Sequence, residues 1–160
     1  MKQKELAVAL KGIVILCLLA LGLLALLLVP SFGKDIAADN PEVAWMFWPC
    51  LIYLWLTCVP VLIVLVLVWR LATEIGRDHS FCPENARRLK WICCLAMADT
   101  GIYVLAGIAA GVWFRGLPPI LLLPLFFILC LGVAIAVVAA VLSHLVQKGS
   151  DLQAEQDLTI

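Results

Sequence analysis

Long apolar runs alternate with short polar stretches along this chain, and each run is long enough to cross a membrane as a helix. An α-helix rises about 1.5 Å per residue, and the hydrocarbon core of a bilayer is about 30 Å thick. The pattern therefore predicts an all-α fold, an integral membrane four-helix bundle that forms a single membrane domain. The predicted spans cover residues 12–30, 48–70, 91–114 and 118–146.

Tryptophan and proline residues mark the ends of several of these runs. Two tryptophan pairs bracket the second and the third run, Trp48 with Trp69 and Trp91 with Trp113. Each pair is separated by about 31–33 Å of helix, which is typical of the aromatic belts at the two membrane interfaces. Pro30 is predicted to end the first span and Pro60 to kink the second, because proline lacks the amide hydrogen that a helix interior uses.

The composition excludes an ordinary soluble domain. Hydrophobic residues make up 65% of the chain and charged residues 14%, whereas a soluble domain is usually about 25% charged. The formal net charge is zero, so direct binding to nucleic acid is not expected. The seven cysteines form no C-x-x-C pair and no cluster with histidine, so we expect free thiols, no metal site and no cofactor.

The basic residues predict the orientation of the spans. With four spans, both chain ends and the middle loop lie on one side of the membrane. That side holds nine of the eleven lysines and arginines, whereas Lys34 and Arg115 lie on the other. By the positive-inside rule the nine are cytoplasmic. We therefore predict a multi-pass protein of the cytoplasmic (inner) membrane, surrounded by the lipid bilayer, with a cytoplasmic loop at 71–90 and a cytoplasmic tail at 147–160.

Small residues predict how two of the spans pack. Lipid is as apolar as leucine, so helices in a bilayer associate through close backbone approach rather than through burial of apolar area. Gly107 and Gly111 lie four residues apart in the third span, and Gly132, Ala136 and Ala140 repeat at the same spacing in the fourth. We expect these two stripes to face each other in a hairpin.

Asp99 is the most unusual residue within the apolar runs. It lies eight residues, or about 12 Å of helix, beyond Trp91. A carboxylate at this depth costs about 2.5–3.5 kcal/mol on insertion scales, so it should face the bundle interior and find a partner. The candidate partners for an intramembrane polar site are Arg70, His144, Ser143, Thr57 and Thr100. The site either binds a proton or a ligand, or is a structural polar link between helices.

The loop between the second and third runs is charged and rich in turn-forming residues. Pro83 suits a first helical position and Glu84 then lies in the first turn, so the spacing predicts a helix that runs from Pro83 into the third span. Arg87, Arg88 and Lys90 then fall at the membrane boundary. They either anchor the span or form a docking surface for a cytosolic partner or anionic lipid.

The chain ends in an acidic tail, which holds Asp151, Glu155 and Asp157 against one lysine. An ordinary terminus is polar throughout and frays, but this one finishes with aliphatic residues beside acids. The tail is therefore either a solvated end or a short amphipathic segment that docks on a partner.

Two short motifs lie in these polar stretches. The first consists of Gly76, Phe81, Pro83, Glu84, Asn85, Arg88 and Leu89, and the second of Glu155, Gln156, Asp157, Leu158, Thr159 and Ile160. With the four-span layout, they resemble a family of small bacterial membrane proteins, domain-of-unknown-function family 2975. In that family a similar loop precedes the third span and a similar sequence ends the chain. Cys82 departs from the family's usual serine or threonine, so a strong helix cap is not expected.

The resemblance also implies a partner. Proteins of this kind are often encoded beside a very small helix-turn-helix regulator. The resemblance therefore implies a membrane protein that binds or restrains a cytosolic transcription regulator. The implied contact residues are Phe81, Glu84, Asn85, Arg88, Leu89, Glu155, Asp157, Leu158, Thr159 and Ile160.

Three classes of function compete. An integral membrane regulatory or interaction protein is preferred, because two polar elements share one predicted cytoplasmic face. The alternative is a small transporter, channel or ion- or proton-sensing protein that uses Asp99 and the Pro60 kink. Four helices leave little room for a pathway, so this alternative calls for a homo-oligomer. An enzyme is not expected, because the sequence has no histidine cluster, no glycine-rich phosphate loop and no nucleophile–base motif.

Overall fold

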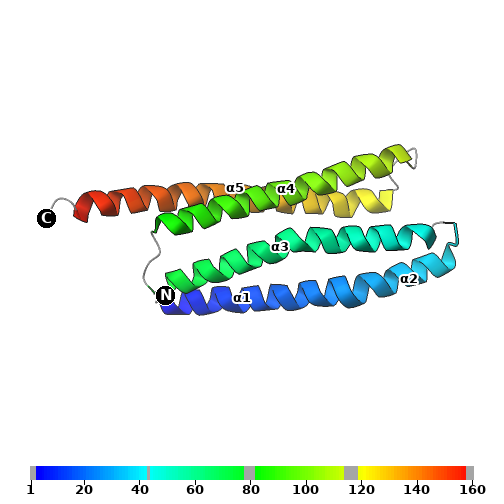
Figure 1. The fold of residues 1–160 in the computed structure, drawn as a ribbon, viewed down its shortest axis with the longest axis horizontal. Coiled ribbons are helices and arrows are strands. Elements are labelled where there is room, and N and C mark those ends of the chain that lie inside the picture. The colour runs from blue at the N-terminus through cyan, green and yellow to red at the C-terminus, as the bar shows by residue number, and fades with distance from the viewer. Residues whose placement is uncertain (1–2, 43, 78–81, 114–118, 158–160) are drawn as a thin grey trace.

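A computed structural model describes residues 3–42, 44–77, 82–113 and 119–157, and these form an all-α bundle, as the sequence predicts (Figure 1). The helices are α1 (Gln3–Leu23), the π-helical turn η1 (Leu24–Leu28), α2 (Val29–Asp39), the short 3-10 helix η2 (Ala44–Met46), α3 (Phe47–Ile75), α4 (Pro83–Trp113) and α5 (Pro119–Asp157). Four helical stretches of the described chain are long and apolar enough to span a membrane. They cover Lys4–Asp39, Ala44–Ile75, Pro83–Trp113 and Leu125–Leu152.

The outer surface of the bundle is apolar along most of its length. Large side chains such as Leu16, Leu62, Leu105 and Leu131 are exposed. In water this exposure would be costly, since burial of apolar area stabilises a protein by about 25 cal/mol per Å². In a bilayer the same side chains meet lipid tails, so the exposure pattern is that of an integral, multi-pass membrane protein.

The first span is longer than the sequence predicts. Pro30 does not end the helix, which continues from Lys4 to Asp39. The π-helical turn Leu24–Leu28 lies immediately before α2, and Pro30 occupies one of the first two positions of α2. Proline has no amide hydrogen to donate, so it would normally interrupt the hydrogen bonds of a continuous helix. The wider π-helical turn just before Pro30 shifts these hydrogen bonds, and the helix continues past the proline.

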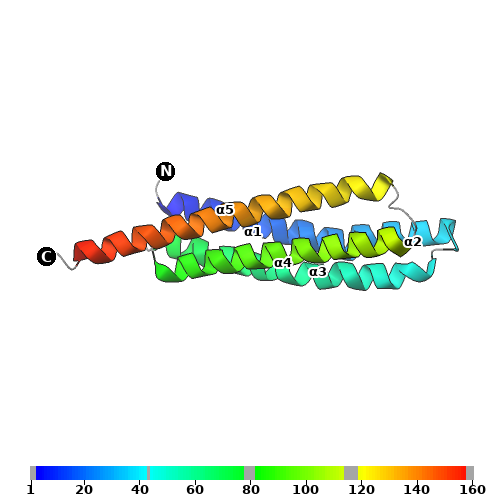
Figure 2. The same ribbon diagram turned by 90° about the horizontal axis from the view of Figure 1, so that it is seen from above.

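The later spans also differ in length from the predicted ones. α3 contains Pro60 in its interior, and the helix bends part-way along its length (Figure 1). α4 begins at Pro83 and runs without a break into the third span, as predicted. α5 continues to Asp157, so most of the predicted tail is helical. Its last turns extend past the ends of α1 and α4 in both Figure 1 and Figure 2.

The four spans form two antiparallel hairpins that pack side by side (Figure 1). α1 packs on α3, α4 packs on α5, and the hairpins meet through α3 and α4. Within the described residues, α1 has no Cα atom within 8 Å of α4 or α5. One end of the bundle is formed by the start of α1, the end of α3, the start of α4 and the end of α5 (Figure 2). We call this the basic end of the bundle, because it carries residues such as Lys4, Arg77 and Lys148.

Small residues let α4 and α5 approach closely, but with a different pattern from the predicted one. A Cβ atom added to Gly132 would overlap the Thr100 hydroxyl and lie 3.2 Å from Thr100 Cβ, so α5 has no room for a side chain here. Ala136 and Ala139 are buried, whereas Ala140 is exposed. The buried positions alternate spacings of four and three residues, because a helix with 3.6 residues per turn needs both spacings to keep one face.

The two predicted stripes do not pair glycine with glycine. A Cβ atom on Gly107 would lie 2.8 Å from Leu125 Cδ2, so Gly107 faces α5 but meets a leucine side chain. The α4 residue opposite Gly132 is Thr100, which lies two helical turns nearer the basic end than Gly107 does. The predicted helix hairpin is therefore present, and it includes a tight contact between Gly132 and Thr100.

Candidate functional site

The loop motif forms the start of α4, where it builds a helix cap and a polar cluster. The Cys82 carbonyl accepts hydrogen bonds from the amides of Asn85 and Ala86, at 3.0 and 3.4 Å. Asn85 is fully buried, and its Oδ1 accepts a hydrogen bond from Arg88 Nη1 at 3.0 Å. Arg88 Nη2 also donates to the exposed Glu84 carboxylate at 3.2 Å. The polar side chains of the motif thus bind one another within the first turns of the helix.

α3 and α5 cover the buried side of this motif. Ala86 is buried, and its carbonyl oxygen accepts a hydrogen bond from the Ser143 hydroxyl of α5 at 2.9 Å. Leu89 packs with Ile92 and Ala139 in a buried apolar cluster, around which side chains of α3 also pack. A hydrogen bond and an apolar cluster together therefore fix α5 against α4 at the basic end.

The predicted partner contacts divide into buried and exposed residues. Asn85 and Leu89 are buried, so in this structure they support the helix packing. The Glu84 side chain is 78% exposed and that of Arg88 is 19% exposed. Glu155 is exposed on the last turns of α5. The remaining predicted contacts, or their side chains, lie outside the described residues: Phe81, Asp157, Leu158, Thr159 and Ile160.

The last turns of α5 carry acidic residues. Asp151 and Glu155 are exposed and lie one turn apart, and Gln147 Nε2 donates a hydrogen bond to Asp151 Oδ1 at 3.4 Å. Leu152 is 56% exposed beside them. All three residues belong to the last turns of α5, and this end of the helix extends past the other helices (Figure 1). We call Asp151, Leu152 and Glu155 the tail surface.

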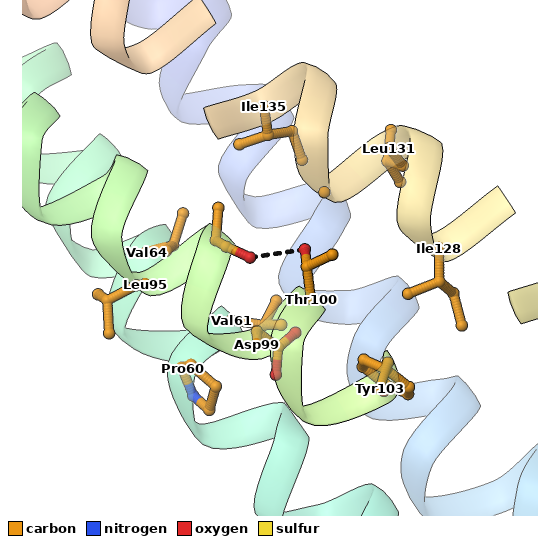
Figure 3. A pocket seen from close by; sticks show the side chains of 12 residues that line it. Pro60, Val61, Val64, Leu95, Asp99, Thr100, Tyr103, Ile128, Leu131 and Ile135 are labelled. Carbon is orange, nitrogen blue, oxygen red and sulfur yellow. Dashed lines mark hydrogen bonds between the residues drawn. The ribbon is translucent and has the colours of Figure 1, made fainter. Parts of the chain in front are cut away.

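Asp99 lies in a pocket where α3, α4 and α5 meet (Figure 3). The pocket has a volume of about 270 Å³. α3 contributes Pro60 and Val61 to its lining, and α5 contributes Ile128 and Leu131. The Asp99 carboxylate is the charged group in this lining, and the side chains around it are mostly aliphatic.

Among the described residues, Asp99 forms no ion pair. Its Oδ1 atom is buried and has no hydrogen bond within the described part of the chain. Arg70 and His144 are exposed and do not line the pocket. His144 lies twelve residues beyond Gly132, which does line it, and this is about 18 Å of helix. The predicted site of Asp99, Arg70 and His144 is therefore not assembled here.

The predicted hydroxyl donors bind other acceptors. Thr57 Oγ1 donates to the Leu54 carbonyl at 2.9 Å and lies 2.9 Å from the Tyr103 hydroxyl. Thr100 Oγ1 donates to the Ala96 carbonyl at 2.7 Å, the dashed line in Figure 3. A helical threonine commonly bonds the carbonyl of the preceding turn in this way. Within the described part of the chain, neither hydroxyl group donates to Asp99 Oδ1.

Sequence reasoning missed Tyr103, which lines the Asp99 pocket. Its ring packs edge-on against Tyr53, with centroids 5.7 Å apart, and Tyr53 donates a hydrogen bond to the Ile102 carbonyl at 3.2 Å. Both tyrosines of the chain lie within apolar spans, and Tyr103 follows Asp99 by four residues. That spacing places the two residues on one helix face and is the signal that identifies Tyr103.

The charged and sulfur-containing side chains suggest no metal centre. Among the described residues, no three histidine, cysteine, aspartate or glutamate side chains are grouped closely enough to hold a metal ion. The seven cysteines are free thiols. A single carboxylate among aliphatic side chains is a poor ligand set for Ca²⁺ or Mg²⁺, which need several oxygen atoms. The Asp99 pocket instead favours a ligand that pairs with a single carboxylate and packs its remaining atoms against apolar side chains.

Comparison with known proteins identifies the family. A family model described as "Protein of unknown function (DUF2975)" matches residues 31–160. The chain belongs to this family. The DUF2975 match covers both polar motifs and everything after the first predicted span, which confirms the resemblance noted in the sequence.

A curated relative agrees with the membrane fold. This DUF2975 chain is 30% identical over 159 residues to the uncharacterized membrane protein YoaS of Bacillus subtilis (strain 168). The alignment covers 98% of this chain and 94% of the relative. No solved structure matches the chain at a significant level. The family is therefore one of membrane proteins.

Proposed function

We propose that this DUF2975 protein is an integral membrane regulatory protein that binds or restrains a small cytosolic helix-turn-helix transcription regulator. The basic end of the bundle then faces the cytoplasm, and the membrane is the cytoplasmic (inner) one. The role is that of a binding partner rather than of an enzyme, and the chain itself makes no contact with nucleic acid. The observation that supports this most is the extension of α5 beyond the bundle as an exposed acidic helix (Figure 1).

Charge complementarity favours a DNA-binding protein as the partner. Helix-turn-helix proteins present lysine and arginine side chains to the phosphates of DNA. The tail surface presents two exposed carboxylates one turn apart, from Asp151 and Glu155, with the exposed Leu152 beside them. Such a helix can occupy the basic surface that would otherwise contact DNA, and the leucine adds an apolar contact. Binding at the membrane would therefore withhold the regulator from its DNA sites.

The loop contributes to this surface through its exposed residues. Asn85 and Leu89 act through packing, because both are buried. Glu84 is exposed at the same end of the bundle and is available for contact. Arg87 and Lys90 are also exposed there and suit anionic lipid headgroups, which would hold the basic end at the cytoplasmic leaflet.

One observation favours a second function, as a small transporter, channel or ion- or proton-sensing protein. Asp99 Oδ1 is buried in the pocket and has no hydrogen-bond partner within the described residues. Ionisable groups inside membranes are expensive and usually mark a pathway or a ligand site. A pathway through this protein would require several copies to assemble, because one chain supplies four spans.

Affinity capture from native bacterial membranes tests the first function. The full-length chain is compared with a chain that ends at Lys148, and bound proteins are identified by mass spectrometry. We expect the full-length chain to recover a small helix-turn-helix protein and the shortened chain to recover about tenfold less, because the tail surface is absent. Asp151→Asn with Glu155→Gln should also lower recovery, and Asp35→Asn with Asp39→Asn, at the opposite end, is the matched control.

Two outcomes of this experiment decide between the functions. Equal recovery by the full-length and shortened chains, or recovery of no helix-turn-helix protein, contradicts the first function. Asp99→Asn should leave recovery unchanged and abolish any ion flux or sensing that depends on the carboxylate. The chain that ends at Lys148 should keep any ion flux or sensing but should no longer recover the partner.

A further inference from the structure

The Asp99 pocket combines a buried carboxylate oxygen with aliphatic walls. Asp99 Oδ1 has no hydrogen-bond partner within the described residues. The two other polar side chains of the lining make hydrogen bonds elsewhere: the Thr100 hydroxyl donates to the Ala96 carbonyl, and the Tyr103 hydroxyl lies 2.9 Å from Thr57 Oγ1. Asp99 is the charged residue of the lining, so its carboxylate is the group that can pair with a cationic ligand.

The walls of the pocket are apolar and come from three helices. Pro60 and Val61 of α3 form one side, and Ile128, Leu131 and Ile135 of α5 form another (Figure 3). Figure 3 shows Asp99 on α4 between these two sides. The volume of about 270 Å³ lies just below the range of about 300–1,000 Å³ that is usual for ligand pockets. The pocket therefore suits a small ligand with a compact apolar body.

The pocket lies within the membrane-spanning part of the bundle. α1 contributes no residue to its lining, and within the described chain α1 has no Cα atom within 8 Å of α4 or α5. Asp99 lies about 12 Å of helix beyond Trp91, at a depth where lipid tails surround the bundle. A ligand that partitions into the bilayer can enter sideways without crossing water.

We propose that this pocket binds a lipophilic ammonium, that is, a primary amine with a compact apolar body. The ammonium group pairs with the Asp99 carboxylate and neutralises its charge, while the apolar body packs on Ile128 and Leu131. The Tyr103 ring lines the same pocket and adds a cation–π attraction. The inference rests on the second proposed function, because it names a ligand class for the same carboxylate.

Other occupants fit the pocket less well. A metal ion needs several oxygen ligands, and no group of three metal-binding side chains occurs among the described residues. A lipid acyl chain would fill the apolar walls but leave the buried carboxylate without a donor. An anionic ligand would be repelled by Asp99. An ammonium with an apolar body satisfies both the charge and the walls.

A matched pair of ligands tests the proposal on the unaltered protein. The full-length chain is placed in lipid nanodiscs and titrated with 1-naphthylmethylamine or with its neutral counterpart, 1-naphthylmethanol. Binding is followed by the fluorescence of the naphthyl group, with empty nanodiscs subtracted. We expect the amine to bind about tenfold or more tightly than the alcohol, because both can donate a hydrogen bond to the carboxylate but only the ammonium carries the opposite charge. Equal affinities overturn the proposal.

Three variants locate the site. Asp99→Asn keeps the size of the side chain and removes its charge, so the affinity for the amine should fall about tenfold while that for the alcohol stays the same. Val61→Phe fills the pocket, so both ligands should bind more weakly. Asp151→Asn removes a carboxylate outside the pocket and should change neither affinity. Unchanged amine affinity in the Asp99→Asn protein overturns the proposal.

A flux measurement separates this inference from the function on which it rests. Proton and sodium flux are measured in vesicles that contain the wild-type protein or the Asp99→Asn protein. If flux depends on Asp99 but the amine shows no preference over the alcohol, the ligand class is overturned and the transport function stands. If the amine binds through Asp99 and no flux depends on this residue, the ligand site is supported and the transport function falls.

Discussion

Replacing Gly132 with alanine is expected to lower the free energy of unfolding by about 1–3 kcal/mol, the usual cost of overpacking a tight contact. The added Cβ atom would overlap the Thr100 hydroxyl and lie 3.2 Å from Thr100 Cβ. Thr100 has little freedom to turn away, because its hydroxyl donates to the Ala96 carbonyl at 2.7 Å. The two helices must therefore move apart, which weakens the α4–α5 hairpin. Unfolding by titration with SDS in mixed micelles measures the change.

Two further variants control for this effect. Gly101→Ala changes a glycine on the facing helix where nothing lies within 4 Å of the added Cβ. Alanine favours helix over glycine by about 1 kcal/mol, so this variant should be neutral or slightly stabilising. Thr100→Ala should restore stability to the Gly132→Ala chain, because it removes the hydroxyl that the new methyl group meets. Equal losses at both glycines, or no rescue, would contradict the close contact.

Replacing Asn85 with alanine is expected to destabilise the protein by about 1–3 kcal/mol, because buried polar groups lose a hydrogen-bond partner. Asn85 is fully buried, and Arg88 Nη1 donates to its side chain at 3.0 Å. The neighbouring Ala86 carbonyl holds Ser143 of α5, so a disturbed helix start also weakens this link. The same SDS titration reports the loss of stability.

Glu84→Ala is the matched control for Asn85. The Glu84 side chain is 78% exposed, and its ion pair with Arg88 is worth about 0–1 kcal/mol, as usual for a surface pair. Glu84→Ala should therefore leave stability almost unchanged while lowering capture of the partner. An Asn85→Ala protein with wild-type stability that no longer captured the partner would place Asn85 in the interface and contradict its structural role.

The existence and number of the spans could be predicted because a membrane helix needs a long apolar run, which is a local property of the sequence. The positions at which the helices begin and end could not be predicted in the same way. Pro30 by itself indicates a helix end, and only the π-helical turn Leu24–Leu28 lets the first span pass it. The tail reads as a polar end, yet α5 continues to Asp157, because extending an existing helix is much easier than starting one.

The candidate site could be predicted only in part. Asp99 is recognisable from its depth in an apolar run, since a charge there is expensive. Its neighbours depend on how three helices rotate about their axes, and the hydropathy pattern does not fix that rotation. The sequence suggests Arg70 and His144 because they lie near the ends of neighbouring spans, whereas Tyr103 and aliphatic side chains line the pocket. The tight contact of Gly132 with Thr100 sets the relative position of α4 and α5.

The orientation of the basic end tests the proposed function most directly, because the tail surface can meet a cytosolic regulator only if that end is cytoplasmic. In a chain whose seven cysteines have been replaced, single cysteines are introduced at two exposed positions, Asn40 and Lys148, at opposite ends of the bundle. Cells are treated with a membrane-impermeant maleimide. We predict labelling of Asn40→Cys in intact cells and of Lys148→Cys only after permeabilisation. Labelling of Lys148→Cys in intact cells would contradict both the orientation and the proposed partner.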